Sequence, residues 1–144
     1  MNYKNFDLVV FAQGQGGNKI LQGLRRLDML DANYQTAILN RWTGEGSTNA
    51  TPRVTTGATS NNVFSDYFVE DASYIRIQNV QLGYTLSPTV SEKIGVSKFR
   101  IYTGVNNLYT FTKYKGYDPG ASNGAPIGGG IDYGFYPIPR TYLF

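Results

Sequence analysis

Apolar and polar residues alternate along three stretches of the chain, which is the pattern of β-strands with two different faces. The stretches are residues 6–15, 73–86 and 98–111. In the first, every second position is apolar: Phe6, Leu8, Val10, Ala12 and Gly14. Its other face is mixed. The alternation therefore predicts an all-β fold built on these strands.

The second stretch changes phase part-way along. Ile75 and Ile77 share one parity, whereas Val80, Leu82 and Tyr84 share the other. Either a bulge near Asn79 brings both sets to one face, or the first half lies where neither face must be apolar.

The third stretch has a clear apolar row. Phe99, Ile101, Thr103 and Val105 are expected on one face, with Arg100, Tyr102 and Gly104 on the other. About ten residue steps at ~3.3 Å, tilted by ~40°, cover ~25 Å, the height of the apolar band of an outer-membrane barrel.

Helical spacing occurs mainly in the long connection between the first two strands. Leu21, Leu24, Leu27 and Leu30 predict a helix within residues 18–30, and residues 34–42 predict a shorter one. Residues 43–62 are expected to form a loop, with strand signal returning at Tyr67. One helical turn is expected over residues 89–94, and renewed pairing only from about Arg140, because Pro137 and Pro139 precede it.

The connections alternate between long and short, which favours a membrane barrel. About fifty residues separate strands one and two, and about ten separate strands two and three. Barrels of the outer membrane have long external loops and short periplasmic turns. A half-buried sandwich strand has the same alternation, so a soluble or secreted carbohydrate-binding β module stays open as an alternative.

Composition excludes several classes of site. Among the 144 residues there is no Cys and no His, so disulfides, thiolate zinc sites and His-based catalysis are excluded. Charged residues make up 16% and aromatic residues 15%, and the net charge is +3. The cationic residues are scattered, which gives no reason to expect nucleic acid as a partner.

The first strand runs into Gly14, Gly16 and Gly17, which is the order of parts in a phosphate-binding turn. Lys19 is followed by Ile20 rather than Ser or Thr, and no βαβ unit follows. The glycines are better explained as a sharp exit of the strand into a long loop.

Five stretches of sequence resemble one family. They are LNRWTGE (residues 39–45), TPRVT (51–55), SDYFVEDASYIRIQNVQLGYTL (65–86), YTGVNNLYTFTKYKGYDP (102–119) and GIDYGFYPIPRTYLF (130–144). Their order and spacing are similar to the C-terminal end of SusC/RagA proteins, which are TonB-dependent outer-membrane transporters of Bacteroidota. The resemblance covers nearly the whole chain.

The resemblance implies an antiparallel meander of about four strands, with short helices in a long external loop. It would be the C-terminal part, residues 1–144, of a 22-stranded outer-membrane β-barrel. It also implies import of glycans or oligopeptides under a SusD-like surface lipoprotein that acts as a lid. TonB would act through an N-terminal region absent here, and the remaining barrel strands would pair with this segment.

The family's last strand continues beyond PRTY, whereas this sequence stops at Phe144. We therefore expect a piece of a longer chain, which alone would self-associate or fold its apolar faces together.

Arg41 and Trp42 are the candidate ligand or lid contacts, because an exposed indole can stack on a sugar ring. The structural alternative is that Trp42 packs a loop and Arg41 binds loop carbonyls. No catalytic, cofactor-binding or metal-binding residues are predicted. Glu70 and Asp71 are adjacent on a strand and so point to opposite faces, whereas glycoside hydrolysis needs converging carboxylates.

Asp118 and Asp132 each precede a turn and are expected to accept backbone hydrogen bonds rather than to bind calcium. Five aromatic residues near them are expected to pack the loop, with ligand stacking as the alternative: Tyr114, Tyr117, Tyr133, Phe135 and Tyr136.

Overall fold

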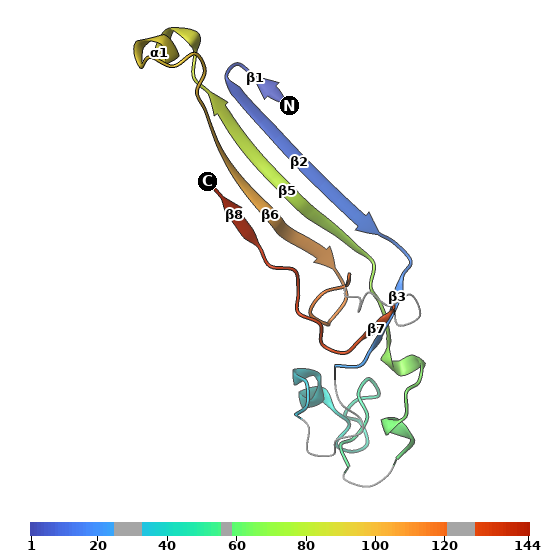
Figure 1. Ribbon diagram of the computed structural model, residues 1–144. Helices are drawn as coiled ribbons and strands as arrows, with labels where there is room; N and C mark the ends of the chain where they lie inside the picture. Colours follow the sequence, from blue (N-terminus) through green and yellow to red (C-terminus); the bar gives the residue numbers. More distant parts are fainter. Residues whose placement is uncertain (25–32, 56–58, 121–128) are drawn as a thin grey trace.

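The computed structural model describes residues 1–24, 33–55, 59–120 and 129–144. These residues form one long sheet, with a smaller sheet and a group of loops at one end (Figure 1). The long sheet has the order β1-β2-β5-β6-β8, and every neighbouring pair is antiparallel. Its strands are β1 (Asn2–Tyr3), β2 (Phe6–Gln15), β5 (Tyr74–Thr85), β6 (Arg100–Thr112) and β8 (Thr141–Leu143). The predicted all-β antiparallel fold is confirmed.

The register places the apolar rows of the three long strands on one face. Directly paired residues of antiparallel strands share a face. The apolar rows across β2, β5 and β6 include Leu8–Leu82–Thr103, Val10–Val80–Val105 and Gly14–Ile75–Phe111. The opposite, polar face includes the rows Gln13–Arg76–Thr110 and Gln15–Tyr74–Thr112. The prediction that Ile101, Thr103 and Val105 form one row, opposite Tyr102 and Gly104, is confirmed.

A bulge brings the two phases of β5 together. The register against both neighbours skips Gln78, which lies between Ile77 and Asn79. On β6 the same irregularity leaves Asn107 and Leu108 opposite Gln78, and Asn107 has a φ of 54°. The bulge predicted near Asn79 is therefore confirmed, because Ile77 and Val80 lie on the same face despite their different parity.

The described residues form no second layer over either face of the long sheet (Figure 1). On the apolar face, Val10 is 57%, Ile75 60% and Ile101 58% exposed. The buried hydrophobic residues of the described ranges are Ile20, Ala72 and Tyr114, all near the smaller sheet. The described residues do not form the buried core of a sandwich.

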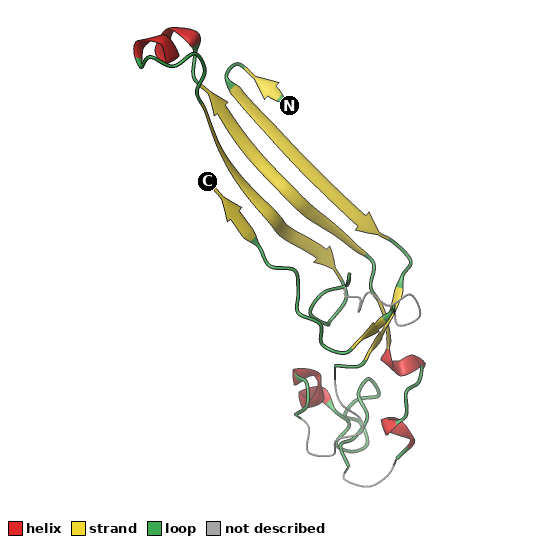
Figure 2. Ribbon diagram, viewed as in Figure 1, coloured by secondary structure: helices red, strands yellow, loops and turns green. Residues whose placement is uncertain are grey.

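The short and long connections lie at opposite ends of the long sheet, with helical segments confined to the connections (Figure 2). At one end, α1 (Pro88–Lys93) confirms the helical turn expected over residues 89–94, and Gly95 follows it at φ 75°. In the described ranges no helix is long and apolar enough to cross a membrane.

The helix expected within residues 18–30 is wrong where it can be checked. Lys19–Gln22 forms β3, which pairs antiparallel with β4 (Val69–Asp71) and parallel with β7 (Ile131–Asp132). Ile20 is buried beside Ala72, so tertiary packing outweighs the helical spacing of the leucines. Leu27 and Leu30 lie outside the described residues.

Two other boundaries differ in detail. The helix expected over residues 34–42 is a short 3₁₀ helix, Thr36–Asn40. The strand expected from Tyr67 starts at Val69, because Asp66–Phe68 forms another 3₁₀ turn. A third 3₁₀ turn is Ser60–Asn62.

Candidate functional site

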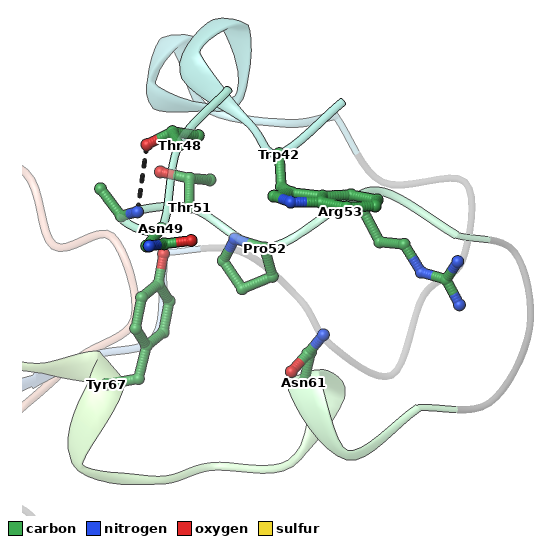
Figure 3. Close-up of a pocket in the computed structure, with 9 residues that line it drawn as sticks. Trp42, Thr48, Asn49, Thr51, Pro52, Arg53, Asn61 and Tyr67 are labelled. Carbon is green, nitrogen blue, oxygen red and sulfur yellow. Dashed lines mark hydrogen bonds between the residues drawn. The ribbon is translucent and has the colours of Figure 1, made fainter. Parts of the chain in front are cut away.

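The long connection between β3 and β4 contains a recess of about 410 Å³, which we call the Trp42 bowl (Figure 3). It is lined by Trp42, residues 48–53, Asn61 and Tyr67. Asn49 and Tyr67 lie on one side of Pro52 in this view, and Arg53 and Asn61 lie on the other (Figure 3). The bowl is thus made by one connection of this chain.

Hydrogen bonds within the loop hold its walls. The backbone N–H of Trp42 donates to the Thr51 carbonyl over 2.8 Å, which joins the two ends of the segment. Between them, the Ala50 N–H donates to Thr48 Oγ1 over 3.1 Å. The turn at its far end closes through Ser47 Oγ, which donates to the Gly44 carbonyl over 2.7 Å. These bonds fix the backbone that carries Trp42 and Arg53.

Polar side chains around the bowl retain their hydrogen-bonding capacity. Asn49, Arg53 and Asn61 make no side-chain hydrogen bond or ion pair with the described part of the chain. The Trp42 side chain is partly open, since the residue is 38% exposed. The bowl therefore offers an aromatic surface beside one guanidinium and two amides.

Arg41 does not line the bowl. Its Nη1 donates to the Ile38 carbonyl over 3.4 Å, which is the loop-carbonyl contact named as the structural alternative. The structure therefore separates the two predicted candidates: Trp42 lines the recess together with Arg53, whereas Arg41 lies outside it.

A second group of polar contacts ties the end of the long sheet to the loop after β6. Arg76 Nη2 lies 2.5 Å from Asp118 Oδ1, and the two side chains are 4% and 7% exposed. Asp118 also accepts from the Gly120 N–H over 2.8 Å, as expected for a turn. Arg76 Nε donates to Thr110 Oγ1 over 2.9 Å. The buried Arg76 guanidinium and Asp118 carboxylate therefore neutralise each other.

Near the smaller sheet, Asp132 also accepts hydrogen bonds from a turn and from a side chain. Its Oδ1 accepts from the Gly134 N–H over 2.8 Å, and its Oδ2 accepts from Tyr114 Oη over 2.7 Å. Burial, followed by this bond to a carboxylate, raises the pKa of the Tyr114 phenol. The predicted turn roles of Asp118 and Asp132 are confirmed.

The aromatic residues near these turns differ in their exposure. Tyr114 is buried at 6% exposure, so the packing interpretation is confirmed for it. Tyr117, Tyr133 and Tyr136 are exposed within the described chain.

Glu70 and Asp71 bind different partners and do not converge. Glu70 accepts from Gln22 Nε2 over 3.0 Å and from the Lys115 N–H over 3.2 Å. Asp71 accepts from Ser73 Oγ over 2.6 Å, and this bond, with the one from the Ser73 N–H, lowers the pKa of Asp71. In the described ranges, acidic residues do not gather in groups of three that would suit a metal ion.

Comparisons with known proteins agree on one class of receptor. The chain is 34% identical over 149 residues to TonB-dependent receptor P3 of Formosa agariphila, covering 99% of this chain and 15% of that protein. It is 32% identical to TonB-dependent receptor SusC of Bacteroides thetaiotaomicron, covering 99% of this chain and 14% of SusC. No family model matches the chain.

The fold has a matching segment in a solved transporter. The structure of the RagAB peptide importer in its open-open state superposes with a TM-score of 0.76 at 26% identity. The match covers 97% of this chain and 15% of that one. The chain belongs to the SusC/RagA-type TonB-dependent receptors. It spans about 15% of the length of such a receptor.

Within this receptor segment, the sequence pattern indicates Trp42 as a candidate but does not indicate Arg53 or the Arg76–Asp118 pair. Arg53 lies in the TPRVT stretch, and only the fold of the loop brings it beside Trp42. Arg76 is an arginine on an otherwise uncharged part of a strand, which was an available signal for a buried ion pair.

Proposed function

We propose that the segment forms part of the wall and external loops of an outer-membrane nutrient importer. In this proposal residues 1–144 belong to the C-terminal part of a 22-stranded barrel. The apolar face of the long sheet contacts lipid, and the polar face lines the lumen. The observation that carries the proposal is the uncovered apolar face that runs across β2, β5 and β6.

An apolar face of this kind is stable where lipid replaces water. In a soluble protein, exposed residues such as Val10, Ile75 and Ile101 would leave a large apolar patch in water. In a bilayer the same face is the outer wall, and aromatic residues lie at its borders. Phe6 and Tyr84 at one end, with ring centroids 4.7 Å apart, and Tyr109 and Phe111 at the other fit these borders.

The partners proposed for the whole receptor follow from its relatives. We infer a SusD-like surface lipoprotein as a lid, TonB as the source of energy, and a glycan or oligopeptide as the nutrient. The long connection between β3 and β4 lies at the end opposite the short turns, where a lid or a nutrient would make contact (Figure 1).

Single-cysteine labelling of the intact receptor tests the direction of the two faces. This segment contains no native Cys, so Ile101→Cys and Tyr102→Cys introduce isolated thiols in it. We expect a membrane-restricted reagent to label Ile101→Cys and a water-soluble reagent to label Tyr102→Cys. Equal reaction of both thiols with the water-soluble reagent would contradict a lipid-facing wall.

A further inference from the structure

We propose that the Trp42 bowl binds an anionic saccharide, with Trp42 as the platform for a pyranose ring and Arg53 as the partner of its carboxylate or sulfate. This inference rests on the proposed function as a nutrient importer and names the class of nutrient. It concerns a recess that one connection of the chain forms by itself.

The charge of the bowl favours an anion. Among the described residues, Arg53 is the charged residue of the lining, and no Asp or Glu of these ranges lines the recess. Its guanidinium has no ion-pair partner in the described part of the chain. A guanidinium presents its donors in a planar fork that fits the oxygens of a carboxylate or a sulfate, and such charge-assisted bonds are stronger than neutral ones. The carboxylate or sulfate of a ligand would supply the ion-pair partner that the described part of the loop does not provide for Arg53.

The aromatic and amide groups favour a sugar ring as the carrier of that anion. Trp42 offers a flat apolar surface, and Pro52 and Tyr67 also line the recess. Asn49 and Asn61 each provide an amide that both donates and accepts, as ring hydroxyls also do. A pyranose has an apolar face of C–H groups and a rim of hydroxyls, so it matches both kinds of surface.

The size of the recess suits a small ligand, and its backbone contacts favour a saccharide over a peptide. A recess of about 410 Å³ lies within the range of small-ligand sites, which is ~300–1,000 Å³. An extended peptide binds largely through main-chain hydrogen bonds. The N–H groups of Trp42, Ala50 and Asn61 already donate to Thr51, Thr48 and Thr59 within the loop. These three N–H groups are thus not free to pair with a peptide backbone, which favours recognition through side chains.

Calorimetry on the intact receptor, purified in detergent, tests the proposal with four probes. These are a galacturonic acid trimer, a sulfated galactose trimer, a neutral galactose trimer and a tripeptide. We expect at least one anionic trimer to bind, and the neutral trimer to bind about tenfold or more weakly, as expected for loss of one charge-assisted bond. The carboxylate and sulfate probes distinguish the source of the anion.

Single substitutions test whether the saccharide binds in the bowl. Arg53→Gln is expected to remove the preference for the anionic trimer, and Trp42→Ala to weaken both anionic and neutral saccharides. Arg41→Gln is the matched control, since Arg41 lies outside the bowl and should leave affinity unchanged. Thermal unfolding of each variant separates lost binding from lost folding.

Several outcomes would overturn the inference. Equal affinity for charged and neutral trimers, or equal effects of Arg53→Gln and Arg41→Gln, would remove Arg53 from recognition. Binding of the tripeptide alone would assign the bowl to a peptide instead. The cysteine-labelling test above does not depend on these results, so an importer with a different nutrient would still show its lipid-facing wall.

Discussion

Arg76 and Asp118 form a buried ion pair between the polar face of β5 and the loop that follows β6, with Nη2 and Oδ1 2.5 Å apart. Arg76 also donates to Thr110 on the neighbouring strand, and Asp118 accepts the Ile138 N–H over 3.3 Å. The pair therefore joins β5, β6 and the chain that leads into β8. Its position beside the polar face lets one contact fix both the loop and the final strand.

Breaking this pair from one side is expected to be costly. Asp118→Leu leaves the buried Arg76 guanidinium without its carboxylate, for which a loss of about 3–5 kcal/mol is typical. The double variant Arg76→Met with Asp118→Leu removes both charges and should regain most of that stability. Urea unfolding of the intact receptor measures both values. A double variant as unstable as the single one would show that the pair is needed for more than charge neutralisation.

Tyr114 is expected to keep its proton at alkaline pH. Its pKa is raised above the ordinary value by burial and by the bond to Asp132. Below about pH 10 the folded and unfolded states both hold the proton, so this group adds no pH dependence there. As pH rises above that value the unfolded state loses the proton first, and the stability of the folded state falls.

Phenolate absorbance of wild type and Tyr114→Phe tests this protonation. The two proteins should gain the same absorbance between about pH 9 and 11, where ordinary tyrosines titrate. An additional gain of one tyrosine in the wild type over that range would show that Tyr114 is not shielded.

Charge on the apolar face should destabilise the wall in the membrane. Val105→Arg, midway between the two aromatic borders, is expected to cost ~2–4 kcal/mol, whereas Ile101→Arg should cost less, because Ile101 pairs with Tyr84 at one border. Tyr102→Gln on the polar face should have a mild effect. Refolding of the intact receptor into lipid vesicles measures the difference. Similar sensitivity on both faces would contradict the assignment of one face to lipid.

Asn107 carries the bulge and a tertiary bond together. It has a φ of 54°, and its Nδ2 donates to the Pro139 carbonyl over 3.0 Å. Asn107→Gly keeps the left-handed backbone but loses the bond, so a loss of about 1 kcal/mol is expected. Asn107→Val loses the bond and adds ~1–3 kcal/mol of backbone strain. Equal unfolding free energies for the two variants would show that the left-handed conformation is not required.

The strands of the long sheet could be predicted because their information is local. Alternation in residues 6–15 and 98–111 reports one buried or lipid-facing side, and the change of phase between Ile77 and Val80 reports the bulge. The positions of Pro137 and Pro139 also give the start of β8, because neither residue can donate to a sheet.

The smaller sheet and the bowl depend on contacts between distant residues. Leu21 pairs with Val69 on one side and Ile131 on the other, which no pattern within residues 18–30 reveals. Likewise, Trp42 is distinctive as the single tryptophan, but its neighbour Arg53 is selected by the fold of the loop. The sequence therefore identified an aromatic candidate without its charged partner.

Deletion of residues 33–62 from the intact receptor should separate the wall from the loop. This segment contributes Trp42, Arg53 and Asn61 to the bowl, and its described residues, 33–55 and 59–62, contribute no strand to either sheet. We therefore expect the barrel to assemble and to keep its resistance to heat in detergent. Nutrient uptake by cells that carry the deletion should fall, because the lid or ligand contact is lost. The double variant Trp42→Ala with Arg53→Gln should lose uptake to the same extent if the bowl itself binds the nutrient. If only the deletion lowers uptake, another part of the loop makes the contact. Unchanged uptake and unchanged lid binding after the deletion would show that this connection only fills space at the barrel rim.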